Sequence, residues 1–302
     1  MNISIIGNGA IGSLLAHKLV NIGNFPHLWD KTNNPIIQSH LINLNGKKTT
    51  HTFKANNSTL LIKSDTIFIC LKAHAILKSM HVLQKYISYK TNLIFVHNGI
   101  ISREKLNKLY PYNSKFIMVT SLAAQKLNLN TVRHTGDNFS WIGAINKSYN
   151  SQKVISRLIN LNFIKLNSAP QIYNIQLKKL CINMIINYIT TVNDCKNGAL
   201  AQKKYNQLIL DLSTECRNIL EKEQFNIELE EILAITYEVI QKTQNNTSSM
   251  LQDKINNRKT EADYISGYFI ELAHKHNLEI PLIISYHNKI KQLQERIGHD
   301  RT

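Results

Sequence analysis

Long apolar runs are absent from this 302-residue sequence: no stretch reaches the roughly 20 residues that a membrane-spanning helix needs. The N-terminus opens directly into a strand-like segment, without the basic region, apolar core and cleavage site of a secretory signal. Cysteine is also sparse, with four residues and no CxxC pair, which argues against disulfides and against a zinc site. We therefore expect a cytoplasmic protein with reduced thiols, no membrane partner and no bound metal.

Acidic residues are scarce as well, with 20 Asp and Glu against 36 Lys and Arg and a formal net charge of +16. A basic protein attracts polyanions, so nucleic-acid binding has to be considered. No stretch, however, interleaves clustered Lys or Arg with aromatic residues, and no recognised nucleic-acid-binding motif is present. We interpret the charge as mostly compositional, useful in part for attracting an anionic cofactor and substrate, and we expect no nucleic-acid partner.

Strand-like and helix-like segments alternate through the N-terminal part of the chain. The short apolar or β-branched runs that predict buried strands are 2–7, 27–29, 66–71, 92–97 and 116–120, and the helix-like segments are 11–22 and 76–86. Region 35–62, rich in Asn, Thr and Lys, is only weakly patterned. The alternation predicts a doubly wound parallel sheet, an α/β domain of Rossmann type over residues 1–169. From residue 170 onward the pattern is almost wholly helical, which predicts an all-helical second domain over 170–302.

A glycine-rich turn, Gly7-Asn8-Gly9-Ala10-Ile11-Gly12, follows the first strand and opens the first helix. In this G-x-G-x-x-G pattern the first glycine allows a tight turn, the second lets a pyrophosphate approach the backbone, and the third lets helix and strand pack closely. The helix N-terminus adds free N–H groups and a favourable dipole for the anion. The turn therefore predicts a dinucleotide site, although a glycine turn without a ligand is the alternative.

The residues at the end of the second strand do not decide between NADH and NADPH as the cofactor. An acidic residue here normally accepts from the ribose 2′-OH, whereas a basic residue favours a 2′-phosphate. Asp30 and Lys31 are adjacent, so Asp30 favours a ribose 2′-OH while Lys31 favours a 2′-phosphate.

Two polar residues follow the strands that end near Leu71 and His97. Ligands of open α/β sheets bind beyond the carboxyl ends of the strands, so Lys72 and Asn98 are placed to reach a cofactor or a substrate. A solvated loop lysine and an ordinary Asn-Gly turn are the alternatives.

A polar stripe crosses an otherwise apolar segment in the helical region: Lys179, Asn183 and Asn187 recur at a spacing of four. This spacing puts the three side chains on one helical face. An ammonium and two amides cost roughly 1–3 kcal/mol each if they are buried without partners. The stripe must therefore face a water-filled cleft, a carboxylate or a substrate, unless it forms an internal hydrogen-bonded network.

Two further segments near the C-terminus match helix starts. Ser249 and Gln252 fit a capping box, S-x-x-Q. Thr260-Glu261-Ala262-Asp263 fits a helix start with acidic residues in its first turn, which on pattern alone favours a structural role for Glu261.

Taken together, these residues resemble the ketopantoate reductase (2-dehydropantoate 2-reductase) family over essentially the whole chain. The matching pieces are Gly7-Asn8-Gly9-Ala10-Ile11-Gly12, Leu71-Lys72-Ala73, His97-Asn98-Gly99, Lys179-x3-Asn183-x3-Asn187, Asn197-Gly198, Ser248-Ser249-Met250-Leu251-Gln252-Asp253 and Thr260-Glu261-x-Asp263-Tyr264-Ile265-x-Gly267. The last two blocks are the most specific to the family.

The resemblance implies NADPH-dependent reduction of ketopantoate to pantoate, in the pathway to pantothenate and coenzyme A. It implies that Lys179 is the general acid that protonates the ketone oxygen, and that Glu261 organises the site and binds a substrate hydroxyl. The substrate-binding residues it implies are Asn98, Asn183, Asn187, Asn197, Asn246 and Ser249. The cofactor-binding residues it implies are Gly7, Asn8, Gly9, Ala10, Ile11, Gly12, Lys31, Lys72 and Asn98, with Lys31 in place of the family's usual arginine for the 2′-phosphate.

The sequence departs from the family pattern at two points. Asp30 beside Lys31 argues against a strict preference for NADPH. Tyr188 follows Asn187, where proline is common in the family. The alternatives are a related two-domain NAD(P)-dependent dehydrogenase acting on another 2-oxo acid and a non-catalytic NADP-binding sensor. A non-catalytic sensor would be expected to lose Lys179 or Glu261, and both are present. We expect a monomer or homodimer acting on a small-molecule substrate.

Overall fold

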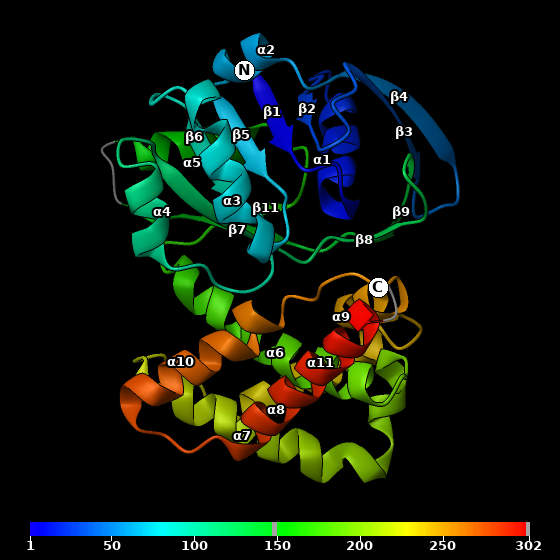
Figure 1. Cartoon of the computed structure of the whole chain (residues 1–302), viewed down its shortest axis with the longest axis vertical. Helices are drawn as coiled ribbons and strands as arrows, with labels where there is room; N and C mark the ends of the chain where they lie inside the picture. Colours follow the sequence, from blue (N-terminus) through cyan, green and yellow to red (C-terminus); the bar gives the residue numbers. More distant parts are fainter. Residues whose placement is uncertain (147–149, 300–302) are drawn as a thin grey trace. The chain divides into compact units, whose positions relative to one another are not determined.

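The computed structural model describes residues 1–146 and 150–299, and its contacts divide into two compact units (Figure 1). The first unit comprises Met1–His97 and Ile101–Ile175, and the second comprises Asn98–Ile100 and Gln176–Thr302. The first is an α/β unit built on a parallel sheet and the second is helical, so the predicted fold class is confirmed. No helix in the described part of the chain has both the length and the apolar composition to cross a membrane.

The first unit is built around a seven-stranded sheet of order β11-β10-β7-β6-β5-β1-β2. Its strands are β1 (Ile3–Ile6), β2 (His27–Trp29), β5 (Thr66–Ile69), β6 (Asn92–Phe95), β7 (Lys115–Thr120), β10 (Ser140–Ala144) and β11 (Leu166–Ser168). Its helices are α1 (Ala10–Val20), α2 (Ser58–Ile62), α3 (Ala73–Leu83), η1 (Gln84–Tyr86), α4 (Arg103–Leu109) and α5 (Ser151–Asn160). Every neighbouring pair is parallel except β10 with β7, so most crossovers run through helices.

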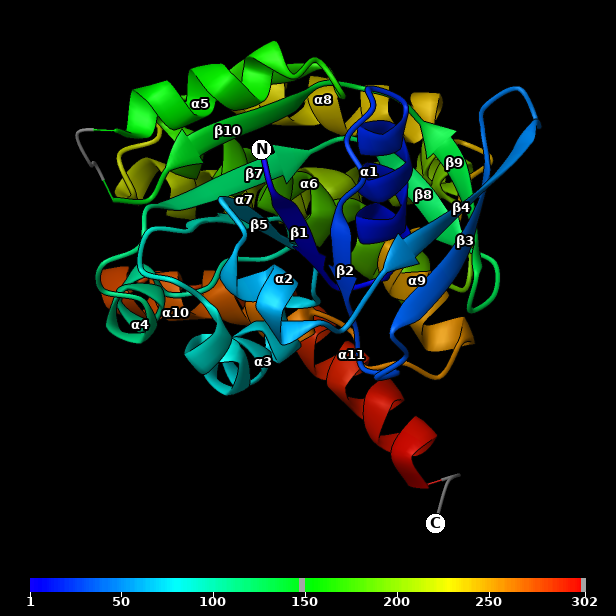
Figure 2. The same cartoon turned by 90° about the horizontal axis from the view of Figure 1, so that it is seen from above.

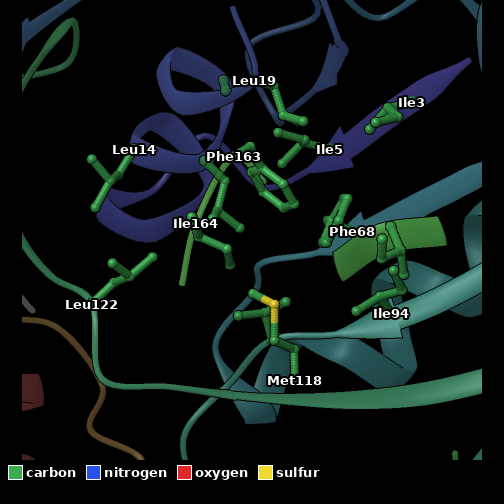
Figure 3. Packing of buried hydrophobic residues seen from close by; sticks show 14 of the residues in the cluster. Ile3, Ile5, Leu14, Leu19, Phe68, Ile94, Met118, Leu122, Phe163 and Ile164 are labelled. Atoms are coloured by element: carbon green, nitrogen blue, oxygen red, sulfur yellow. The ribbon is translucent and has the colours of Figure 1, made fainter. Parts of the chain in front are cut away.

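Helices cover the sheet on both faces because its strands are apolar on both faces. β1, β5 and β7 are buried at every position. On one face, Leu19 of α1 lies beside Ile5 of β1, and the rings of Phe68 and Phe163 cross edge to face at 5.9 Å (Figure 3). The buried face fixes α1, and with it the glycine turn, against the carboxyl end of β1.

A smaller four-stranded sheet, of order β4-β3-β9-β8, packs against the other side of α1 (Figure 2). Its strands are β3 (Ile36–Ile42), β4 (Lys48–Lys54), β8 (Ala123–Lys126) and β9 (Thr131–Gly136). β3 and β4 form the hairpin that occupies the weakly patterned region 35–62. β8 of this sheet packs against α1, and Lys126 at its end reaches Ser13 of that helix.

The second unit contains α6 (Ile172–Val192), which starts in the first unit, and the helices that surround it. These are η2 (Asn197–Ala201), η3 (Lys203–Tyr205), α7 (Asn206–Lys222), α8 (Leu229–Lys242), α9 (Ser249–Ile255), η4 (Ala262–Tyr264), α10 (Ser266–His276) and α11 (Pro281–His299). The Glu215 carboxylate of α7 accepts hydrogen bonds from the N–H groups of Leu282 and Ile283, which caps the start of α11. The long α6 carries the polar stripe.

Candidate functional site

The glycine turn has the geometry that a dinucleotide pyrophosphate requires. Gly7 has φ +104°, and a Cβ there would lie 2.5 Å from the carbonyl oxygen of Cys70. A Cβ at Gly12 would lie 1.9 Å from the carbonyl oxygen of Gly7, whereas one at Gly9 would meet only open space. Gly7 and Gly12 are therefore needed by the fold, and Gly9 leaves room for a ligand.

The N-terminus of α1 is open to an anion. Gly9 occupies the N-cap position and offers no side chain to cap the helix, and the first turn contains no acidic residue. The N–H groups of this turn thus keep their hydrogen-bonding capacity for a ligand. The predicted cofactor residues Gly7 to Gly12 lie together, and the pattern of space around them fits a bound diphosphate.

The Asp30 carboxylate at the end of β2 is engaged by its own loop. Its Oδ1 accepts from the Thr32 N–H at 2.9 Å, from the Thr32 hydroxyl at 2.6 Å and from Asn56 Nδ2 at 3.3 Å. Its Oδ2 accepts from Asn8 Nδ2 at 3.5 Å. Burial alone would raise the pKa of Asp30, but these hydrogen bonds outweigh burial and lower it. The neighbouring Lys31 is exposed.

A lysine that the motifs do not mark also reaches this region. Lys126, at the end of β8, donates from Nζ to the Ser13 hydroxyl at 3.0 Å. Ser13 lies in the first turn of α1 and donates to Asn8 Oδ1 at 2.7 Å. No sequence signal distinguishes Lys126, because a lysine in a short amphipathic strand usually faces solvent.

The two strand-end residues lie in different units. Lys72 occupies the N-cap position of α3 in the first unit. Asn98 belongs with the second unit, because the following residues pack on η4. Gly99 has φ +79°, and a Cβ there would lie 2.7 Å from the Tyr264 carbonyl oxygen. The Ile100 N–H donates to that oxygen at 2.9 Å, so the Asn98 loop is held against the segment that contains Glu261.

The polar stripe lies on one face of α6, as predicted from the spacing. Lys179 and Asn183 are partly buried and Asn187 is buried. Among the described residues, no hydrogen bond reaches the side-chain amide of Asn183 or Asn187. These two amides therefore keep their donors and acceptors for a ligand, and a closed internal network does not account for them.

Lys179 is electrostatically coupled to Glu261. Burial lowers the pKa of Lys179 to about 8, and the negative charge of the Glu261 carboxylate opposes this change. Glu261 is itself only 5% exposed and stands at the N-cap position of η4. Because a lysine with a pKa near neutrality can hold or release a proton readily, this pair can perform acid chemistry.

Tyr188 ties η4 to α6 next to the stripe. Its hydroxyl donates to the Ser266 hydroxyl at 2.6 Å and approaches the Ala262 carbonyl oxygen at 3.3 Å. Ser266 in turn bonds to His287 Nδ1 at 2.7 Å. This fully buried tyrosine therefore holds the segment after Glu261 in register with the helix that carries Lys179.

The capping box predicted at Ser249 is displaced by one residue. Ser248 is the N-cap of α9, and its hydroxyl accepts from the Leu251 N–H at 3.3 Å. The Ser248 hydroxyl also bonds to that of Thr190 at 2.8 Å, which anchors α9 to α6. Gln252 donates to the Thr247 carbonyl instead of closing the box. Ser249 is consequently exposed at the first position of α9, with its hydroxyl not needed for capping.

Asn197 and Asn246 are held together by the backbone. The Asn197 N–H donates to the Asn246 carbonyl oxygen at 3.1 Å, and Asn197 Nδ2 donates to the Thr243 hydroxyl at 2.8 Å. Asn197 Oδ1 is buried and has no hydrogen-bond partner among the described residues. Asn197 thus fixes the loop that carries Asn246 and retains one acceptor.

Metal ligation has no support in the described residues, where no group of three or more His, Cys, Asp or Glu side chains is arranged to hold an ion. The four cysteines are free thiols.

Two family models match the chain. The model described as "Ketopantoate reductase PanE/ApbA" matches residues 3–147, and the one described as "Ketopantoate reductase PanE/ApbA C terminal" matches residues 171–294. A 2-dehydropantoate 2-reductase of Vibrio cholerae is 30% identical over 295 residues, covering 98% of each chain. A 2-dehydropantoate 2-reductase of Pyrococcus horikoshii is 30% identical over 298 residues, covering 93% of this chain and 94% of the relative.

Solved structures share the fold over the full length. A D-mandelate dehydrogenase in a ternary structure with NADH and anilino(oxo)acetate is 20% identical, with a TM-score of 0.90, covering 99% of this chain and all of that one. A PanE/ApbA family ketopantoate reductase from Ralstonia eutropha is 15% identical, with a TM-score of 0.88 over 99% of this chain. The resemblance predicted from the motifs is confirmed, and the chain belongs to the ketopantoate reductase family.

Proposed function

We propose that this protein catalyses the NADPH-dependent reduction of 2-dehydropantoate (ketopantoate) to pantoate, a step toward pantothenate and coenzyme A. Membership of the family and full-length relatives named 2-dehydropantoate 2-reductase support this reaction. The observation that carries the proposal is Lys179, an ammonium on an apolar helix whose pKa burial lowers to about 8 beside the charge of Glu261.

Lys179 serves as the general acid. The nicotinamide cofactor supplies a hydride for C2 of the 2-oxo acid, and negative charge builds on the ketone oxygen. The Lys179 ammonium stabilises that charge and delivers its proton to the oxygen, which completes the new hydroxyl. The charge of Glu261 keeps enough of Lys179 protonated near neutral pH for this role.

The remaining polar groups orient the substrate. The Glu261 carboxylate accepts a hydrogen bond from the substrate's own hydroxyl, which is the group that separates ketopantoate from simpler 2-oxo acids. The amides of Asn183 and Asn187, which have no described protein partner, bind the substrate without adding charge. We assign supporting contacts to Asn98, Asn197, Asn246 and Ser249.

The cofactor binds at the glycine turn. Its diphosphate fits the open space at Gly9 and the uncapped N-terminus of α1. Lys72 contributes from the start of α3, and the exposed Lys31 attracts the 2′-phosphate. The loop hydrogen bonds that occupy Asp30 Oδ1 reduce its capacity to accept from a ribose 2′-OH, which favours NADPH over NADH.

Steady-state kinetics with a matched pair of substrates tests the proposal. Ketopantoate is compared with 3,3-dimethyl-2-oxobutanoate, which differs only by lacking the hydroxyl, and each is assayed with NADPH and with NADH. We expect kcat/KM to fall by about 100-fold or more without the hydroxyl, because a buried carboxylate then loses its partner. Equal use of both substrates, or faster turnover of an aromatic 2-oxo acid, would contradict the assignment of substrate.

A further inference from the structure

One lysine within α1, Lys18, and one in the neighbouring β8, Lys126, differ in whether a carboxylate neutralises their charge. Lys18 Nζ forms an ion pair with the Asp137 carboxylate at 2.7 Å. Lys126 Nζ donates to the uncharged Ser13 hydroxyl at 3.0 Å. In residues 1–146 and 150–299, no carboxylate lies within ion-pairing distance of Lys126. Lys126 is thus a partly buried cation whose direct partner carries no charge.

The surroundings of Lys126 favour an anion. Burial lowers the pKa of Lys126, and the charge of Asp30 only partly opposes this change. A cation that has lost water without gaining a paired anion is unfavourable unless a ligand supplies the anion. A bound phosphate would offset the unfavourable free energy of desolvating Lys126, because it would form a charge-assisted hydrogen bond with the ammonium.

The position of Lys126 indicates which phosphate this is. Ser13 links it to Asn8 through a hydrogen bond of 2.7 Å, and Asn8 reaches Asp30 Oδ2 at 3.5 Å. Lys126 therefore joins the network that connects the first turn of α1 with the end of β2. In Rossmann domains the adenosine ribose lies at the end of β2, and its 2′ substituent faces the residues that follow this strand.

We propose that Lys126 binds the 2′-phosphate of NADPH and, with Lys31, sets the preference for NADPH over NADH. The inference rests on the proposed function only in taking NADPH as the cofactor. Together, Asp30, Lys31 and Lys126 present one negative and two positive charges to the 2′ position. The net positive charge favours a dianionic phosphate, which Asp30 alone would repel.

Nucleotide binding without substrate tests this inference independently of the reaction. Lys126→Met keeps the length and apolar stem of the side chain and removes its charge. Lys48→Met, on the exposed outer strand of the same small sheet, is the matched control. Dissociation constants are measured by calorimetry for NADPH and NADH, and for the fragments 2′,5′-ADP and 5′-AMP, at low and moderate salt.

We expect Lys126→Met to raise Kd about tenfold for NADPH and 2′,5′-ADP, with little change for NADH and 5′-AMP. The salt dependence of NADPH binding is expected to weaken, and Lys126→Arg is expected to retain most of the affinity. An unchanged ratio of NADPH to NADH affinity, or equal losses for both, would overturn the inference. Normal nucleotide selectivity without ketopantoate turnover would instead contradict the proposed reaction and leave the role of Lys126 intact.

Discussion

Replacing Glu261 by Gln isolates the electrostatic control of Lys179. The substitution keeps the size of the side chain and removes its charge. The pKa of Lys179, about 8, is the balance of burial, which lowers it, and the Glu261 charge, which raises it. Without that charge, burial acts unopposed and the pKa falls further. One pKa unit corresponds to about 1.4 kcal/mol, well within the Coulomb energy of two charges in a partly buried site.

The direction of the pH effect follows from the role of Lys179 as an acid. Activity requires the ammonium, so kcat/KM is full below the pKa and falls about tenfold for each pH unit above it. We expect the descending limb of the wild-type profile near pH 8 and that of Glu261→Gln about one unit lower. The assay is kcat/KM for ketopantoate across the pH range, with NADPH affinity measured in parallel to verify folding.

A neighbouring acid provides the control. Asp263 lies in η4, two residues after Glu261 at its N-cap, but pairs with Lys291 at 2.9 Å. Asp263→Asn is therefore expected to leave the limb where it is in the wild type. A Glu261→Gln limb that stays in place or moves to higher pH would refute the coupling between Glu261 and Lys179.

Two further predictions concern residues that shape the candidate substrate and cofactor sites. Tyr188→Phe removes the hydroxyl that binds Ser266. We expect this variant to lose about 1–2 kcal/mol in the free energy of unfolding and to have a lower kcat, with its NADPH affinity unchanged. Denaturant titration measures the stability, and steady-state kinetics measure kcat. Gly9→Ala is expected to weaken NADPH binding without lowering the melting temperature, whereas Gly12→Ala lowers both because its Cβ would lie 1.9 Å from the Gly7 carbonyl oxygen. Equal melting temperatures for these two alanine variants would contradict that division of roles.

The buried parallel strands could be predicted from the sequence, but the small sheet could not. β1, β5 and β7 are buried on both faces, so each consists mostly of apolar residues without alternation. In β3, the buried positions include Ser39, whose hydroxyl bonds to His17 Nε2 at 3.1 Å. Because a serine stands where alternation calls for an apolar residue, the strand pattern is broken. The Asn-Gly of its hairpin turn, with Gly46 at φ +79°, is the one local signal that could have revealed it.

In the candidate site, spacing predicted which residues share a helix face but could not reveal their partners. The stripe on α6 follows directly from a period of four. Ser248, the cap of α9, also bonds to Thr190, which lies 58 residues away in the sequence, and spacing gives no sign of this contact. Burial is equally hidden: Lys115 is fully buried with its ammonium donating to backbone carbonyls, yet in sequence it resembles the solvent-exposed lysines.

Two adjacent lysines on α6 separate acid catalysis by Lys179 from a general loss of positive charge. Lys179→Ala removes the proposed acid, and Lys178→Ala removes a lysine that forms an ion pair with Glu231 at 2.6 Å. With ketopantoate and NADPH, we predict that Lys179→Ala lowers kcat by about 100-fold or more, while Lys178→Ala stays near the wild-type value and both variants still bind NADPH. Near-normal turnover in Lys179→Ala would contradict the assignment of Lys179 as the general acid.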